Sequence, residues 1–285
     1  MRTYQKRHLL WIQRLLPCMV VALLPMLAIL LLVSTAVALP AQDPSPPPAA
    51  IFGDLGDAPV ASMTAYTRPI TIPANFPTIY VPGTQSGPFH RFPKEGPYLG
   101  NGVSEEVNAH LKIGEDIEAN INLTDDKANA DREDSKITIQ SLIECQPSPF
   151  TVEVTTNGTY TGTMFLSVWM DFDRNGIWGN TAWRCDQLLS EWAVQNEPIN
   201  LVSGTYTYTV NLTVMPYHPN DPDLDFSPLW MRVTLSDTQT LPPANGGQAD
   251  GSGPPEGYLF GETEDYLLIY RLCDDDCLAR AGWQG

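Results

Sequence analysis

The feature that most constrains the fold is a series of short alternating segments in the second half of the chain. From residue 136 onward, runs rich in Val, Ile, Thr, Tyr and Trp are separated by turn residues. In TYTYTVNLTV (205–214), aromatic and aliphatic residues alternate with threonines and Asn211, which is the period of a half-buried strand. The candidate strands are KITIQSLIE, FTVEVTT, MFLSVWMDF, LLSEWAVQ, GTYTYTVNLTV, PLWMRVTLS and EDYLLIYRL. They predict an all-β fold, an antiparallel β-sandwich of the jelly-roll or immunoglobulin-like type.

The N-terminal 38 residues predict a secretory signal peptide. An apolar run at 15–33 ends close to the small-residue sequence A-V-A at 36–38, and we expect cleavage after Ala38. An uncleaved membrane anchor is the alternative, because the run is long enough to span a bilayer. Pro17 and Pro25 interrupt the run and favour cleavage. The mature chain is then expected to be secreted or held at the cell surface, without insertion into the membrane.

The charge of the chain is strongly acidic. The signal carries four of the 16 basic residues and none of the 33 acidic ones, so the mature chain has a net charge of −21 (12 − 33). Such a surface repels nucleic acid and anionic membranes, and we expect no nucleic-acid partner. The carboxylates either keep the protein soluble or bind divalent cations, and composition leaves both interpretations open.

The mature chain divides into four parts by composition. A proline-rich linker occupies 39–50, and an irregular, acidic segment rich in Pro and Gly occupies 51–135. We call the latter the lead segment. The predicted sandwich covers 136–273, and a C-terminal tail follows at 274–285. This division indicates one β-domain with an irregular lead segment rather than two equal domains.

Four cysteines remain after signal removal, an even number in an oxidising compartment, and they predict two disulfides. These are Cys145, Cys185, Cys273 and Cys277. Four cysteines allow three pairings. We favour Cys145–Cys185 with Cys273–Cys277, because the last two flank only Asp274, Asp275 and Asp276 and would close a small loop.

The stretch VWMDFDRNGIW (168–178) has the spacing of a calcium loop. It places three oxygen-bearing side chains at alternate positions before a glycine, namely Asp171, Asp173, Asn175 and Gly176. In an EF-hand-like loop these are positions 1, 3, 5 and 6, and the carbonyl of Ile177 would be the position-7 ligand. Position 12 is Ala182, so a bidentate carboxylate must come from elsewhere. The alternative is a polar turn, because the same residue types favour tight turns.

The closing strand is the best-placed source of that carboxylate if it pairs near the loop. Within GETEDYLLIY (261–270), the candidate ligands are Glu262, Glu264 and Asp265. The sequence also allows a structural interpretation, in which Gly261 permits a tight turn, Tyr266 lies in the core and Glu264 pairs with an arginine such as Arg232. Both interpretations remain open at this point.

GETEDYLLIY resembles the motif that names the GEVED domain family of secreted bacterial proteins. The strand ending in VWMDF and the strand LWMRVTLS precede it in the family's order. The lead segment also resembles the sequence that often precedes such domains, in FGDLGDAP, His90, YLGNGVSEEVNA and DDKANADREDS. Two positions depart from the pattern, Lys136 in place of a common glycine and Thr263 in place of an apolar residue.

The resemblance implies a recurrent β-sandwich module of large secreted or surface-attached bacterial proteins. Such modules generally have no assigned activity and are associated with calcium binding or adhesion. We therefore expect a structural or adhesive module that binds Ca²⁺, with an extracellular protein or a polysaccharide as its partner.

Two other function classes account for some features of the sequence. Paired carboxylates such as Asp171 and Asp173 would suit a glycoside hydrolase, but the chain contains no nucleophile or metalloprotease motif, and we expect no enzyme. A calcium-stabilised carbohydrate-binding module is the main alternative, because several tryptophans lie in or near the predicted strands: Trp169, Trp178, Trp183, Trp192 and Trp230. Trp178 and Trp183, beside the acidic loop, are the ones expected to be exposed.

Overall fold

The computed structural model describes part of the chain. The described residues are 53–61, 63–67, 70–103, 105, 137–139, 142–156, 158–219, 228–242 and 249–268. All of them belong to one unit spanning Ala49–Gly285. The predicted signal peptide, linker and C-terminal tail, together with Cys273 and Cys277, lie outside the described residues. No helix in the described part of the chain is both long and apolar enough to cross a membrane.

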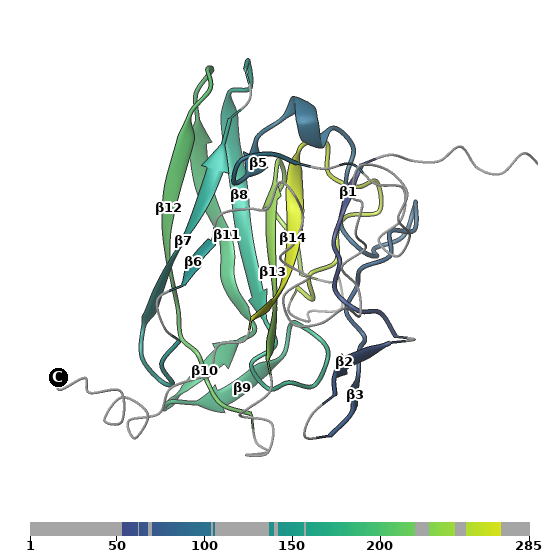
Figure 1. The fold of residues 1–285 in the computed structure, drawn as a ribbon, viewed down its shortest axis with the longest axis vertical. Coiled ribbons are helices and arrows are strands. Elements are labelled where there is room, and N and C mark those ends of the chain that lie inside the picture. Colours follow the sequence, from purple (N-terminus) through teal and green to yellow (C-terminus); the bar gives the residue numbers. More distant parts are fainter. Residues whose placement is uncertain are drawn as a thin grey trace, which may run out of the picture. The chain divides into compact units, whose positions relative to one another are not determined.

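The fold is an all-β sandwich of two four-stranded antiparallel sheets, as predicted (Figure 1). The first sheet has the order β11-β8-β13-β14, and its strands are β8 (Gly162–Met170), β11 (Trp192–Leu201), β13 (Leu229–Ser236) and β14 (Gly261–Leu268). The second has the order β12-β7-β5, with β6 also paired to β7, and its strands are β5 (Tyr98–Leu99), β6 (Ile137–Ile139), β7 (Ser148–Thr155) and β12 (Thr207–Val214).

Three small antiparallel pairs complete the described strands. They are β1 (Asp54–Leu55) with β4 (Phe89–His90), β2 (Thr64–Tyr66) with β3 (Ile72–Pro73), and β9 (Thr181–Arg184) with β10 (Gln187–Ser190). A 3₁₀ turn, η1, covers Pro93–Glu95. The described part of the lead segment thus contains the short strands β1–β5 and is otherwise irregular, in keeping with its Pro and Gly content.

The space between the two sheets is filled by alternate residues of the strands. β13 contributes Met231 and Val233, and β7 contributes Phe150 and Val152, all of them buried. In β12 every second residue is exposed, and Leu212 on the other face is buried. The half-buried strand that the alternation predicted is therefore confirmed.

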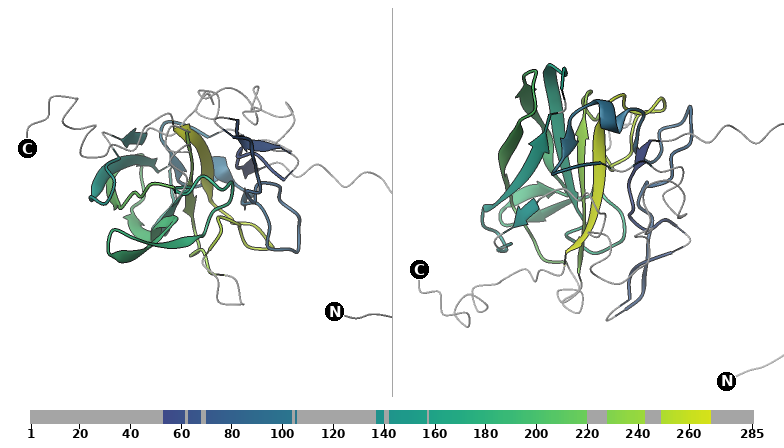
Figure 2. Two further views of the ribbon diagram at one scale, coloured as in Figure 1. Left: turned by 90° about the horizontal axis from the view of Figure 1, so that it is seen from below. Right: turned by 45° about the horizontal axis from the view of Figure 1, so that its top comes forward.

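Strands β13 and β14 of the first sheet are buried on their outer face as well, because the lead segment covers them. Every residue of β13 and β14 is buried. A second apolar cluster joins outer-face residues of this sheet to the lead segment, namely Trp169, Trp192, Trp230 and Leu267 with Ala58, Ala65, Tyr66, Ala74 and Phe76. Figure 2 shows the lead segment running beside β14 on the side away from the second sheet.

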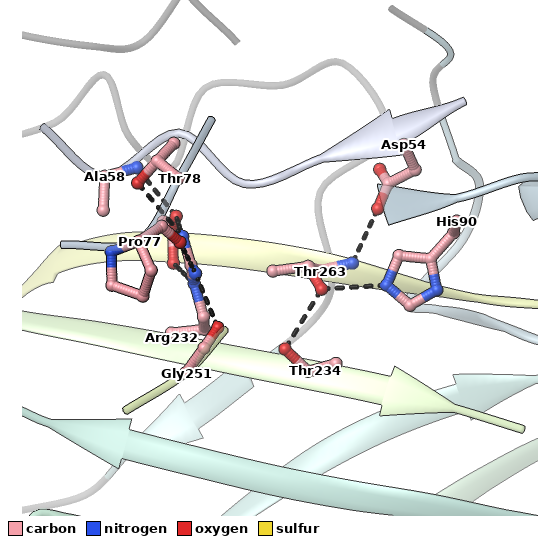
Figure 3. Close-up of polar contacts among 10 residues, drawn as sticks. Asp54, Ala58, Pro77, Thr78, His90, Arg232, Thr234, Gly251 and Thr263 are labelled. Carbon is pink, nitrogen blue, oxygen red and sulfur yellow. Dashed lines mark hydrogen bonds and ion pairs between the residues drawn. The ribbon is translucent and has the colours of Figure 1, made fainter. Parts of the chain in front are cut away.

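A buried ion pair lies on this covered face and forms hydrogen bonds with the lead segment (Figure 3). Arg232 on β13 donates to both carboxylate oxygens of Asp265 on β14, at 2.7 and 2.6 Å, and both residues have no exposed surface. The guanidinium also donates to the carbonyls of Pro77 (2.6 Å) and Gly251 (2.9 Å). The backbone N–H of Ala58 donates to Asp265 at 2.7 Å. The pairing of Arg232 with Glu264 considered from the sequence is thus wrong, since the outward-facing neighbour Asp265 takes that place.

A second polar group lies farther along the same face (Figure 3). Thr263 donates its backbone N–H to Asp54 at 2.7 Å, and its hydroxyl contacts His90 Nε2 (2.9 Å) and the Thr234 hydroxyl (3.0 Å). His90 is completely buried, and this burial lowers its pKa from 6.5 to about 3. The lead segment is thereby hydrogen-bonded to the closing strand through the Asp54 carboxylate and the His90 imidazole.

A disulfide joins the loop before β7 to the β9–β10 hairpin. Cys145, in the loop before β7, is bonded to Cys185, at the tip of the β9–β10 hairpin, with Cα atoms 5.2 Å apart. The predicted Cys145–Cys185 pairing is therefore confirmed.

Replacing Asp265 by Ala should destabilise the fold by about 3–5 kcal/mol, because the Arg232 charge would remain buried without its counterion. Urea unfolding measures this loss. The matched control is Glu197→Ala, at an exposed position of β11, which should change stability by no more than about 0.5 kcal/mol. An Asp265→Ala cost near that of the control would contradict the role of the pair.

His90 should make stability depend on pH below neutrality. Its folded pKa is depressed to about 3, so protons bind preferentially to the unfolded chain and stability is lost as pH falls below 6.5. Between pH 7 and pH 5 the loss from this group should be roughly 2 kcal/mol. On going from pH 7 to pH 5, urea titrations should show that the wild type loses about 2 kcal/mol relative to His90→Gln, and equal changes in the two proteins would refute the assignment.

Candidate metal centre

The loop that follows β8 is shaped by its own acidic side chains. The backbone N–H of Asp171 donates to the carbonyl of Trp230 at 3.0 Å, which fixes the start of the loop beside β13. The Asp171 carboxylate then accepts from the backbone N–H groups of Asn175 (3.0 Å) and Gly176 (2.9 Å). Asp173 accepts from Asn175 at 3.1 Å. The D-x-D-x-N-G sequence therefore forms a tight loop with both carboxylates turned inward along it.

Asp171 and Asp173 meet a third carboxylate, Glu191, and one oxygen from each lies within 4.8 Å of the others. Glu191 stands between β10 and β11 and has no exposed surface. Its two oxygens accept from the backbone N–H groups of Asp173 and Asn180, each at 3.2 Å. This group, which we call the carboxylate cluster, could hold a metal ion.

The carboxylate cluster has no ion-pair partner among the described residues, and the charge of Arg174 offsets only part of the effect of burial on the pKa of Asp171. Burial, and next the charge of Asp173, raises the pKa of Asp171 from 3.8 to about 8. Burial, and next the charges of the two aspartates, raises the pKa of Glu191 well above its usual value. Among the described residues no Lys, Arg or His forms an ion pair with these three, and Arg174 donates instead to the carbonyls of Phe172 (2.6 Å) and Asp171 (3.4 Å). Carboxylates in such a place are stable only when they bind a proton or a cation.

A buried hydroxyl without a partner lies near the same cluster. Tyr217 has no exposed surface, and its hydroxyl makes no hydrogen bond. Its ring packs against that of Phe172, with centroids 5.1 Å apart. Burial raises the pKa of Tyr217, and the charges of the three cluster carboxylates raise it further. An oxygen of this kind is suited to a water molecule bound to an ion in the cluster.

The lead segment forms one wall of the cluster. The Tyr66 hydroxyl donates to Asp171 at 2.8 Å and accepts from the backbone N–H of Trp230 at 3.2 Å. Gly176 has φ of +81°, and a Cβ there would clash with the carbonyl oxygen of Pro73. Asn75 donates its backbone N–H to the Gly176 carbonyl at 2.8 Å. The glycine is thus required both by the loop and by the close approach of the lead segment.

The other predicted loop ligands lie beside the cluster. The side chain of Asn175 is exposed, donates to Asp173 at 3.0 Å and accepts from the backbone N–H of Ile177 at 3.0 Å.

Glu191 was not among the ligands predicted from the sequence. The one available signal was its position as a lone charge inside the apolar segment LLSEWAV, where a buried carboxylate needs a specific partner.

The structure does not bring the closing-strand carboxylates into the cluster. β14 is separated from β8 by β13, so it lies two strand spacings away, roughly 10 Å. Asp265 faces the lead segment and is bonded to Arg232. Glu262 faces the other sheet and accepts from the backbone N–H of Leu99 on β5. Glu264 pairs in register with Val233, on the same face of β14 as Glu262.

Residues 165–269 match the family model of the GEVED domain. These residues form a GEVED domain. No curated protein and no solved structure matches the chain significantly. The GEVED domain begins within β8 and ends just after β14, so it contains all three members of the carboxylate cluster. Tyr66, which contacts that cluster, lies outside the matched range.

The residues of the GEVED motif have structural roles in this domain. Gly261 opens β14 with φ of +110°, which favours glycine, and a Cβ there would clash with the carbonyl of Leu235. Thr263 and Asp265 point outward to the lead segment, while Glu262 and Tyr266 point inward. The motif thus connects the closing strand of the GEVED domain to its neighbours on both faces.

Four of the five tryptophans considered above are buried, and one is exposed. Trp169, Trp192 and Trp230 are buried, and so is Trp178, whose ring lies 4.2 Å from that of Phe76. The expected exposure of Trp178 is therefore wrong, because the lead segment covers it. Trp183, on β9, is 69% exposed, as expected.

Gly176→Ala should cost about 2 kcal/mol more in stability than Gly158→Ala. Both glycines have positive φ, so alanine is strained by about 1–2 kcal/mol at either site, but a Cβ at Gly158 meets nothing within 4 Å. The excess measures the close packing of the lead segment on the loop. Thermal and urea unfolding of both variants tests this, and equal costs would show that the lead segment does not dock there.

Proposed function

We propose that this protein is a secreted structural or adhesive module whose fold is stabilised by a calcium ion bound in the carboxylate cluster. The observation that carries the proposal is the convergence of Asp171, Asp173 and Glu191 within 4.8 Å, with two of the three completely buried. Two buried acidic side chains beside a third destabilise the fold unless they are neutralised. A divalent cation provides that neutralisation by displacing the protons that the buried carboxylates would otherwise bind.

The chemistry of the donors favours calcium. The cluster offers only oxygen ligands, which suit hard cations, whereas zinc in proteins is usually bound by Cys and His. Calcium accepts six to eight oxygens in flexible geometry, and Mg²⁺ demands a near-ideal octahedron. A site built from a loop and the start of a distant strand, with water to fill the remaining positions, suits the less demanding ion.

The position of the cluster supports a structural role for the ion. It would connect the loop after β8 to the junction of β10 and β11. Through the hydrogen bond from Tyr66 to Asp171, it would also stabilise the docking of the lead segment. An ion that binds only the folded state stabilises it by RT ln(1 + [L]/Kd), about 2.7 kcal/mol at 100 times Kd.

Two further observations support a secreted, non-catalytic module. The Cys145–Cys185 disulfide is typical of an oxidising compartment, in agreement with the N-terminal signal that the sequence predicts. Asp171 and Glu191 have no exposed surface, so they are not placed to act on a substrate as a glycosidase pair would. The intact mass of the exported protein would test cleavage after Ala38.

Millimolar Ca²⁺ added after chelator treatment should raise the melting temperature of the wild type by several degrees, and magnesium should raise it less. Glu191→Gln should remove most of the calcium response, because it deletes one of three charged ligands. The matched control, Glu197→Gln, lies six residues away at an exposed position of β11 and should retain the full response. Differential scanning fluorimetry measures the melting temperatures of the wild type and the two variants.

Two results would refute the calcium proposal. The first is an unchanged wild-type melting temperature over the calcium titration. The second is a calcium response that Glu191→Gln and Asp173→Asn both retain. Either outcome would mean that the D-x-D-x-N-G loop is a polar turn only.

A further inference from the structure

The β9–β10 hairpin carries an exposed apolar pair on its outer face. Trp183 is 69% exposed and Leu188 is 64% exposed. The two residues are directly opposite each other in the register of the hairpin. Side chains at such positions lie about 5 Å apart at Cβ, so the pair forms one continuous apolar surface. Thr181 and Ser190, also opposite each other and two positions away, place hydroxyls on the same face.

The opposite face of this hairpin is anchored in the core. Leu189 is buried in the main apolar cluster, and Ala182, its partner across the hairpin, packs against that cluster. The orientation of the hairpin is thereby fixed, and the face with Trp183 and Leu188 is held toward solvent. Successive side chains of a strand point to opposite faces, so a strand that buries one face in the core turns its other face away from the core.

Both ends of the hairpin are restrained. At its tip, Cys185 is bonded to Cys145, whose backbone N–H donates to the Pro216 carbonyl at 3.0 Å. At its base, Glu191 donates its backbone N–H to Asn180 at 2.9 Å and accepts from the Asn180 N–H at 3.2 Å. A surface that is ordered before binding loses little conformational entropy when a ligand arrives. The restraint of this solvent-exposed hairpin therefore favours ligand binding.

The size and charge of the surface limit the partner. Two apolar side chains are far too few for a stable protein interface, which buries about 800 Å² on each side. The chain has a net charge of −17, which opposes anionic ligands. A neutral sugar ring fits these limits, because its C–H face can stack on an indole ring while its hydroxyls bond to the hydroxyl of Thr181. The Ser190 oxygen accepts from the backbone N–H of Trp192 at 3.1 Å, so Ser190 would act as a donor to the sugar. A polysaccharide repeats this small epitope many times, which raises the apparent affinity.

We propose that the outer face of the β9–β10 hairpin, centred on Trp183 and Leu188, binds a neutral polysaccharide. This inference rests on the proposed function in one respect, since it gives the adhesive module its ligand and uses the carboxylate cluster to hold the base of the hairpin. The tip of the hairpin is fixed by the Cys145–Cys185 disulfide, so its orientation does not depend on the ion.

The test is retention of the oxidised protein on insoluble neutral polysaccharides in the presence of calcium. The probes are microcrystalline cellulose, chitin and granular starch, with bound protein measured by depletion from the supernatant. The wild type should bind at least one of them, Trp183→Ala should weaken that binding at least tenfold, and Leu188→Ala should weaken it less. The matched control is Tyr206→Ala, which removes another exposed aromatic side chain (52% exposed) and should bind as the wild type does.

The outcomes separate this inference from the calcium proposal. Failure of the wild type to bind all three polysaccharides, or equal binding by Trp183→Ala, would overturn the inference. Trp183→Ala should keep the wild-type calcium shift in melting temperature, because its side chain lies outside the cluster. A calcium shift without polysaccharide binding would leave the proposed function standing alone. Trp183-dependent binding without a calcium shift would support the inference and refute the ion site.

Discussion

Arg232 and Asp265 lie side by side on β13 and β14, completely buried between the sheet and the lead segment. Such a pair is stable only when every charged atom finds a partner, and the lead segment provides three of those partners, at Pro77, Thr78 and Ala58. The rest of the structure depends on this arrangement. Without the lead segment, the ion pair and the tryptophans of the outer face would be exposed to solvent, and β14 would be a bare edge strand.

The physical unit is therefore larger than the GEVED domain matched at residues 165–269. The matched range contains the whole first sheet except the start of β8, but only β12 of the second sheet. The lead segment covers the outer face, and β7 packs against the inner one. Tyr66 shows the dependence most directly, because it lies 105 positions before Asp171 in the chain and donates to the carboxylate of that residue. A cation bound in the carboxylate cluster would thus be energetically linked to the docking of the lead segment through one hydrogen bond.

The acidic residues of the closing strand illustrate how charge in a sequence can be misread. Glu262 and Asp265 look alike in GETED, and both suggested a cation site. In the structure they point to opposite faces and hold different parts of the lead segment, β5 for Glu262 and the stretch around Ala58 for Asp265. Glu191, in contrast, looked like one charge in an apolar strand, and it lies with Asp171 and Asp173 because β11 pairs beside β8.

The sequence by itself determined the features that depend on local pattern. Alternation with period two predicted the strands and the sandwich, and the D-x-D-x-N-G spacing predicted a tight acidic loop, because both depend on near neighbours in the chain. Cysteine parity and spacing also led to the Cys145–Cys185 pair. Only the tertiary structure decided which carboxylates meet and which tryptophans are covered. Trp178 and Trp183 lie five positions apart with similar neighbours, yet one is buried because the lead segment packs on it and the other is exposed on a hairpin. Such outcomes follow from contacts between distant parts of the chain, and local pattern carries no information about them.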